Sequence, residues 1–237
     1  MRRPTALNLG LAAILLSMAG FLACSSGSET NDRPLEVDRE DIGEVGPIDD
    51  LNGITQGTSI RRMTLGELDK SVTVAAGPAA DGSPIFWQAL AGVPLSALDD
   101  RAYGPVLGNP DFVSLTSEDP SPSPLYVKFV QDLSRDVCVQ MVFADATRPP
   151  NQEKVLWPHA PVDSPATEAQ IDENLGYLLL RFLGLEGDEA SGRVTRLRTL
   201  YSVAKTDAEK ANPQTAQHAA WGIVCIALFE DPAFHLH

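Results

Sequence analysis

Apolar residues recur at three- and four-residue spacing in five segments of this chain, which is the pattern of helices with one buried face. The first segment opens with Thr64 and Glu67, a Thr-x-x-Glu capping box, and ends at Gly77-Pro78. Ser123-Pro124 and Ser164-Pro165 predict the N-terminal caps of the next two segments. The predicted helices cover approximately residues 64–76, 123–141, 164–183, 188–206 and 212–229. No alternating run is long enough to predict a sheet, so we expect a mainly α domain of about five helices.

The last predicted helix, residues 212–229, has no polar face after Ala219. Asn212 is expected to cap it and Pro213 to occupy its first turn, where a missing N–H costs nothing. Its apolar run of about 10 to 12 residues is too short to span a bilayer. A helix that is apolar on every side must be surrounded by other elements. We therefore expect the domain to pack around this helix and Asp231-Pro232 to close it.

Glycine and proline interrupt the sequence repeatedly between residues 77 and 122. We expect a long irregular connection inside the domain, with short helical turns near residues 95–102 and 111–115. Phe86 and Trp87 are expected to hold this connection against the core. Because long irregular connections in compact domains are often functional, this segment is one predicted location for a site.

The N-terminus has the organisation of an export signal. Arg2-Arg3 precede an apolar run over residues 9–22, which at about 14 residues is short for a transmembrane anchor. Phe21-Leu22-Ala23-Cys24 resembles the lipobox of bacterial lipoproteins, although that pattern prefers leucine where this chain has Phe21. The resemblance implies that residues 1–23 are removed and that Cys24 is lipidated. It also implies an anchor in the bacterial cell envelope, at the outer membrane or facing the periplasm. Ordinary secretion after cleavage at a small residue is the alternative.

Charge divides the remaining chain into a tether and a domain. Residues 24–60 hold nine acidic side chains and two arginines, a net charge of −7, and their apolar residues are isolated. Such a segment cannot bury enough surface to fold, so we expect a disordered tether before a helical domain at residues 61–237. A docking strip for a basic partner is the other interpretation. Without Arg2 and Arg3 the chain has 16 basic and 32 acidic residues, and this net charge of −16 argues against nucleic acid as a partner.

Two cysteines remain once Cys24 is assigned to the lipid. An exported chain meets an oxidising compartment, in which a pair of cysteines usually forms a bridge. We therefore predict a disulfide between Cys138 and Cys225. Two unlinked thiols packed in the core are the alternative.

Standard catalytic and cofactor motifs do not occur in the sequence. It has no Cys-x-x-Cys-His haem attachment site, Gly-x-Ser-x-Gly elbow, phosphate-binding glycine loop or His-Glu-x-x-His zinc site, and we predict no catalytic residue and no cofactor. Among four histidines, His235 and His237 have ligand-like spacing and are the candidates for metal binding; a frayed surface terminus is the alternative. His218 lies in the last predicted helix, where a buried, hydrogen-bonded histidine is expected rather than a ligand.

Basic residues gather on one predicted helix of this acidic protein. The outer face of residues 188–206 carries Arg193, Arg196, Arg198 and Lys205. We interpret this face as solvated, with pairing to acids of the same chain as the alternative. Glu67 and Asp69, which lie close to Arg61-Arg62, predict helix capping and pairing at the surface.

Both ends of the expected domain resemble one family. Arg61-Arg62-Met63-Thr64-x-x-Glu67-Leu68 is similar to the opening of domains of unknown function in large secreted planctomycete and myxobacterial proteins. Leu180 to Gly184, Leu197 to Tyr201 and Trp221 to His235 resemble the closing helices of the same domains. Those proteins carry or neighbour c-type haem domains, whereas this chain is short and lacks the haem motif. The resemblance implies export and the company of haem proteins rather than a reaction.

Two hypotheses for function follow from the sequence. The first is an envelope-anchored lipoprotein that acts as a non-enzymatic binding or assembly module, with an envelope protein as a possible partner. It rests on the lipobox, the acidic tether and the missing catalytic set. The second is an enzyme or redox accessory protein whose site lies in residues 77–122.

Overall fold

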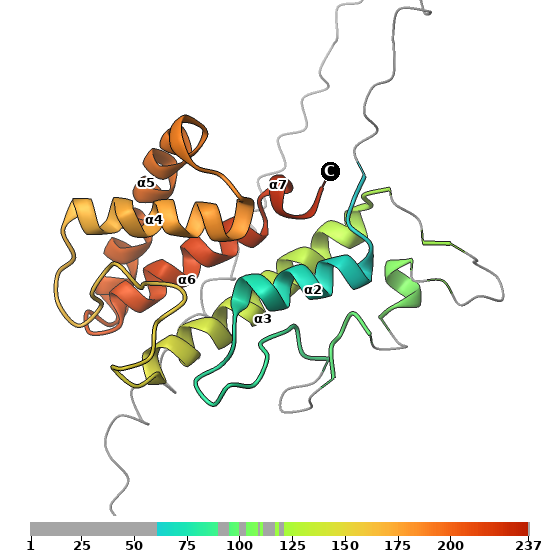
Figure 1. Ribbon diagram of the computed structural model, residues 1–237, viewed down its shortest axis with the longest axis horizontal. Helices are drawn as coiled ribbons and strands as arrows, with labels where there is room; N and C mark the ends of the chain where they lie inside the picture. The colour runs from blue at the N-terminus through green and yellow to red at the C-terminus, as the bar shows by residue number, and fades with distance from the viewer. Residues whose placement is uncertain are drawn as a thin grey trace, which may run out of the picture.

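The computed structural model describes residues 61–89, 95–99, 103–108, 110, 117–118 and 121–236. The predicted signal peptide, Cys24 and the predicted tether lie outside these residues. The described part contains six α-helices and one short 3-10 helix, and in place of strands it has isolated bridges only, such as Arg62 to Leu236 (Figure 1). The mainly α class predicted from the sequence is confirmed.

Helix α2 (Leu65–Ala76) has the ends that its sequence predicts. The Thr64 hydroxyl accepts a hydrogen bond from the Glu67 N–H, and the Glu67 carboxylate accepts one from the Thr64 N–H at 2.9 Å. Gly77 ends the helix with a φ of 67°, a conformation that a Cβ atom disfavours. The Arg181 guanidinium donates to the carbonyls of Val74 and Ala75 and so satisfies two groups that the helix end leaves free.

Helix α3 (Pro124–Thr147) begins where Ser123-Pro124 predicts, because the Ser123 hydroxyl accepts from the Tyr126 N–H at 3.1 Å. The prediction for the following helix was wrong by one turn. Helix α4 (Glu168–Leu183) begins after Thr167 rather than at Ser164-Pro165. Thr167 forms a reciprocal capping box with Gln170, which satisfies two backbone donors that a cap at Ser164 would leave free.

Three helices complete the domain: α5 (Gly187–Ala211), α6 (Ala216–Phe229) and the short α7 (Pro232–His235). Asn212 was predicted to cap α6, but it ends α5 and donates its N–H to the Ala208 carbonyl at 2.8 Å. Residues 193–211 contain no glycine or proline, so nothing in the sequence stops α5 earlier. The intervening turn delays the start of α6 to Ala216.

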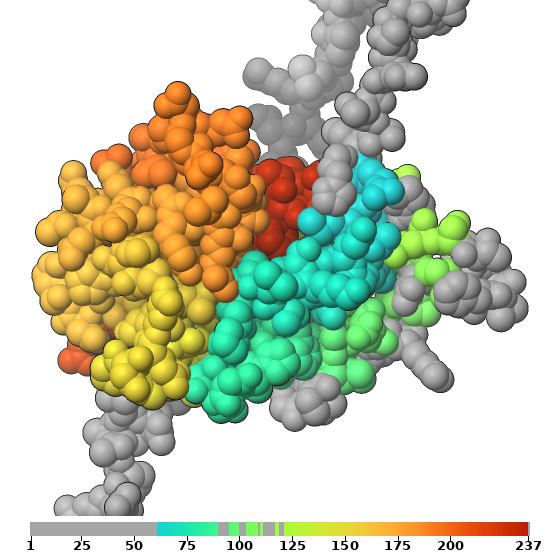
Figure 2. Space-filling view, viewed as in Figure 1, coloured from blue at the N-terminus to red at the C-terminus, as the bar shows by residue number. Residues whose placement is uncertain are grey.

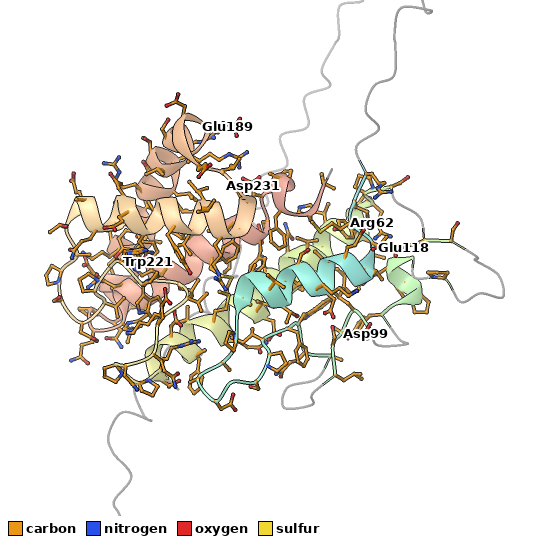
Figure 3. All side chains as sticks on the ribbon, in the orientation of Figure 1. Arg62, Asp99, Glu118, Glu189, Trp221 and Asp231 are labelled. Atoms are coloured by element: carbon orange, nitrogen blue, oxygen red, sulfur yellow. A yellow bond between two sulfur atoms is a disulfide. The ribbon has the colours of Figure 1, made fainter. Side chains whose placement is uncertain are left out.

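The predicted central helix is confirmed. No residue of α6 is exposed, and the helix packs against α3, α4 and α5, with Trp221 fully buried (Figure 3). Helix α3 contacts both α6 and α2, so it joins the two sides of the domain. The predicted disulfide is present between Cys138 of α3 and Cys225 of α6, with a Cα–Cα distance of 5.8 Å. Both cysteines are buried, and the bridge fixes the core helix to its neighbour.

The connection after α2 is held by aromatic rings, as expected for Trp87. Its ring lies 6.0 Å from that of Tyr103 and 5.6 Å, edge to face, from that of Phe129 on α3. Phe86 is held through its carbonyl, which accepts from the Gln140 amide at 2.9 Å, and the buried side chain here is that of Ile85. The described connection includes a 3-10 helix at Pro105–Leu107 that the sequence did not predict. The turn expected at residues 111–115 lies outside the described residues.

Asp145, near the end of α3, organises the loop that leads to α4. Its carboxylate accepts from the N–H groups of Val155 and Leu156 at 2.8 and 2.6 Å and pairs with Arg148. Burial raises the pKa of this carboxyl group, and the hydrogen bonds act against that shift. No described helix is both long and apolar enough to cross a membrane.

Candidate functional site

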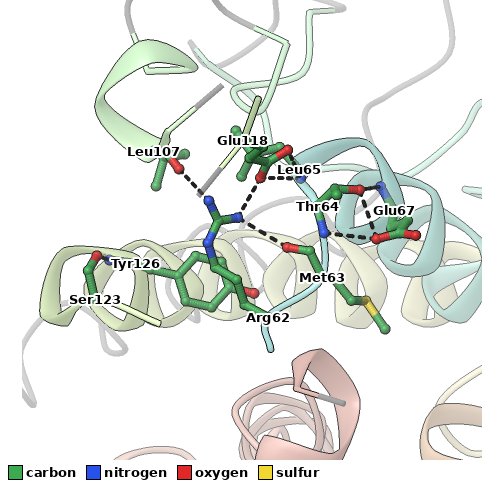
Figure 4. Close-up of polar contacts among 9 residues, drawn as sticks. All are labelled: Arg62, Met63, Thr64, Leu65, Glu67, Leu107, Glu118, Ser123 and Tyr126. Carbon is green, nitrogen blue, oxygen red and sulfur yellow. Dashed lines mark hydrogen bonds and ion pairs between the residues drawn. The ribbon is translucent and has the colours of Figure 1, made fainter. Parts of the chain in front are cut away.

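Arg62 is buried at the point where the described chain begins, with 3% of its surface exposed. Its guanidinium donates to the Glu118 carboxylate at 2.5 Å and to the carbonyl of Leu107 at 2.9 Å (Figure 4). It also lies over the ring of Tyr126, 4.9 Å from the centroid. Glu118 accepts in addition from the Leu65 N–H at the start of α2. Surface pairing was predicted for this arginine and is wrong, since the pair is buried.

The C-terminal segment closes over the same junction. The Met63 N–H donates to the His235 carbonyl at 2.9 Å, and Arg62 and Leu236 form an antiparallel bridge. In Figure 2 this segment (red) fills the surface between the cyan start of the described chain and the orange helices. The two ends of the described chain therefore meet in space.

His235 is not part of a frayed terminus, which corrects one interpretation of the sequence. Its side chain is buried, and its ring lies 5.7 Å from that of Tyr126. Burial lowers the pKa of His235 and raises that of Tyr126 to about 12. His237, the other candidate ligand, lies outside the described residues. Within the described ranges no three His, Cys, Asp or Glu side chains gather in a way that could hold a metal ion.

A groove lies between residues 79–88 and the C-terminal half of α3, with a volume of about 460 Å³. The amides of Gln88 and Gln140 and the half-exposed ring of Phe143 contribute to its walls. Asp136 of α3 accepts from the backbone N–H of Gln88 and from the side-chain amide of Gln140, and the Gln88 side-chain amide in turn donates to Gln140. The wall also holds the Asp81 carboxylate, which accepts from the Ser83 hydroxyl, so the groove offers several hydrogen-bonding groups to a ligand.

A second concavity, which we call the arginine pocket, lies where α4, α5, α6 and α7 converge. Its volume is about 380 Å³. The floor is apolar and belongs to the core, since Leu179 and Leu228 are each only 1% exposed. Arg193 and Arg196 of α5 line the pocket together with Asp231, which lies at the turn into α7 (labelled in Figure 3) and pairs with Arg193. The remaining wall residues are Leu197, Ala227, Pro232 and Ala233.

Most of the predicted basic face is paired with acids of the same chain, which was the alternative interpretation of the sequence. Arg198 pairs with Asp172 at 2.9 Å, Lys205 with Glu209 at 3.6 Å, and Arg193 with Asp231. Among the described residues no carboxylate pairs with Arg196, whose side chain is exposed. Arg196 therefore offers a free guanidinium at the pocket.

The remaining histidines contact aromatic rings. His218 is partly buried and meets Trp157 edge to face at 5.2 Å, and burial lowers its pKa. Its Nδ1 atom has no hydrogen-bond partner among the described residues. His159 lies 5.4 Å from the ring of Tyr177 and 3.6 Å from the Glu173 carboxylate.

The arginines of the pocket are visible in the sequence as a basic helix face, but the pocket itself is not. Asp231 was recognised only as a helix stop, although Asp-Pro is also the signal of a helix N-cap, and Asp231 does cap α7. No local sequence pattern indicated the role of Glu118, because this residue lies 53 positions from the α2 N-terminus that it contacts. Comparison of the chain with protein-family models, curated proteins and solved structures finds no match.

Proposed function

We propose that this chain is an exported, lipid-anchored module of the bacterial cell envelope that binds a ligand rather than catalysing a reaction. The observation that carries the proposal is the disulfide between Cys138 and Cys225. Structural disulfides persist in oxidising compartments and are rare in the cytosol. The disulfide therefore supports export from the cytoplasm, which the N-terminal sequence also predicts.

The proposed anchor is a lipid on Cys24, followed by the acidic tether to residue 60. A flexible chain of about 37 residues has a root-mean-square reach of roughly 35 Å, and self-repelling charges extend it further. The tether would join the domain at Arg62, which is fixed by an ion pair and by a bridge to the C-terminal segment. The tether would thus be attached to a fixed part of the domain.

The binding role is supported by the arginine pocket. It combines an apolar floor with a free guanidinium, in a domain whose residues 61–237 hold 14 basic and 23 acidic side chains. Clefts of roughly 300–1,000 Å³ with few polar groups are typical of small-molecule sites. The second hypothesis, an enzyme or redox accessory protein, would place its site near residues 77–122. The carboxylate in the wall of that groove, Asp81, accepts hydrogen bonds from Ser83 that lower its pKa further from neutrality, which favours binding over acid–base chemistry.

Cell fractionation tests the proposed lipid anchor and the proposed location in the cell envelope together. The wild-type chain should be found in the membrane fraction and be released only by detergent. Cys24→Ser should lose the lipid, and Ser25→Ala, a change at the neighbouring position, should behave as the wild type. Recovery of the wild-type chain in the cytosol, or no difference between Cys24→Ser and the wild type in lipid labelling, would refute the proposal.

A further inference from the structure

We propose that the arginine pocket binds a small monocarboxylic acid with an apolar body, of the class of a medium-chain alkanoate. This inference rests on the binding role proposed above and names the ligand class for it. The carboxylate would be held by Arg196 and Arg193 at the rim, and the alkyl body would lie on the leucine floor.

The floor determines the apolar part of the ligand. Leu179 of α4 and Leu228 of α6 present core side chains to the pocket, and Leu197 of α5 continues this surface. Ala227 and Ala233 are short and leave the space above the floor open. Covering such a surface with an alkyl chain is favourable, and the gain grows with each methylene group that is buried.

The two arginines at the rim, Arg193 and Arg196, determine the charged part of the ligand. Arg193 is held by Asp231, whose second oxygen accepts from the Ala233 N–H at 2.9 Å, so the Arg193 guanidinium is fixed before a ligand arrives. Arg196 has glycine one turn before it and leucine one turn after it, and neither neighbour can neutralise it. A planar guanidinium matches the two oxygens of a carboxylate.

The charge balance of the wall favours one negative charge. Two arginines face one aspartate, which leaves a single positive charge to be compensated. The carbonyl end of α6, which finishes at Phe229, and the Asp231 carboxylate both oppose a second negative charge. A monocarboxylate therefore suits the wall better than a phosphate monoester.

The side chains of the wall also favour an alkyl body over a peptide. Apart from Arg193, Arg196 and Asp231, the side chains lining the pocket are aliphatic. The amide groups of a buried peptide would need hydrogen-bond partners that such side chains do not supply. An alkyl chain has no such requirement.

Calorimetric titration of octanoate into the full chain tests the proposal. The protein is held in lipid nanodiscs so that no free detergent competes, and the heat from empty nanodiscs is subtracted. Octanoate should bind, and octanol, which has the same chain length without the charge, should bind at least tenfold more weakly. Arg196→Met should weaken octanoate binding roughly ten- to hundredfold, the effect of losing a charged hydrogen bond.

Two further variants separate the site from general effects. Lys70→Met removes an exposed basic side chain of α2, a helix that contributes no residue to the pocket lining, and should leave octanoate binding unchanged. Ala227→Leu should fill the pocket and reduce the binding of both compounds. Equal binding of octanoate to the wild type and to Arg196→Met, or binding of N-acetyl-leucine without binding of octanoate, would overturn the proposal. The titration uses purified protein, so its outcome is independent of whether the chain is anchored in cells.

Discussion

Arg62 and Glu118 form a buried ion pair at 2.5 Å that links the start of the described chain to the end of the long connection. The side chains are 2% and 13% exposed. The Arg62 guanidinium also donates to two carbonyls, and Glu118 also accepts from the first N–H of α2. The pair therefore joins three segments that are distant in sequence, and the C-terminal segment lies against the same arginine.

Replacing Arg62 by methionine should destabilise the domain by about 3–5 kcal/mol, because it leaves a buried carboxylate without its partner. Urea unfolding measures this free energy. Arg61→Met, at the exposed neighbouring position, is the matched control and should change stability by less than about 0.5 kcal/mol. Similar losses in the two variants would show that the buried pair has no special role.

Two glycine-to-alanine substitutions should have opposite effects on stability. Gly176 lies inside α4 with open space around it, so Gly176→Ala should stabilise the domain by roughly 0.5–1 kcal/mol. Gly77 has a φ of +67°, and a Cβ there would lie 3.1 Å from the Arg181 guanidinium and 3.2 Å from Val155. Gly77→Ala should therefore destabilise by about 1–2 kcal/mol. Urea unfolding of both variants decides this, and stabilisation by Gly77→Ala would contradict the structure.

His235 should make the domain less stable in mild acid. Burial lowers its pKa in the folded protein, while the unfolded chain takes up the proton near pH 6.5. The stability that comes from a neutral His235 is thus present above about pH 6.5 and is lost as the pH falls towards the folded pKa. The slope from one such group is at most about 1.4 kcal/mol per pH unit.

Unfolding free energies measured between pH 7.5 and 5 test this dependence. His235→Gln should have a shallower slope than the wild type, whatever its absolute stability. Gln214→Ala, at an exposed side chain that does not titrate, serves as the control and should keep the wild-type slope. Parallel curves for His235→Gln and the wild type would mean that His235 does not resist protonation.

The helices were predictable because their signals are local. The capping box at Thr64, the Ser123-Pro124 start and the apolar run of α6 each lie within a few residues of the structure that they specify. The two helix boundaries that were predicted wrongly, the start of α4 and the end of α5, also depend on local signals. Thr167 forms a better cap than Ser164, and α5 continues to Ala211 because nothing ends it sooner.

The site was less predictable because it depends on contacts between distant segments. The basic character of α5 was visible, but its pairing was not, since Arg193 meets an aspartate 38 residues away. The buried partner of Arg62 is 56 residues away. The disulfide is the exception, because counting cysteines left a single possible pair for an exported chain.

Removing the disulfide should cost stability. Closing a loop with a sequence separation of 87 restricts the unfolded chain by about 4–5 kcal/mol in the chain-entropy estimate, and measured losses are typically about 2–5 kcal/mol. The Cys138→Ala/Cys225→Ala double variant should show a loss in this range in urea unfolding without reductant. In the presence of reductant the unfolded wild type loses its bridge, so the difference between the two proteins should shrink. An unchanged unfolding free energy would show that the bridge does not restrict the unfolded chain.

The central claim, an exported and lipid-anchored chain with a bridged core, is tested most directly by the intact mass of the protein purified from its native membrane. The protein is unfolded and alkylated without reductant before the measurement. The account predicts a chain that begins at Cys24, carries a lipid there and has no alkyl group on Cys138 or Cys225. A mass that retains Met1, or that contains two alkylated thiols at Cys138 and Cys225, would contradict it.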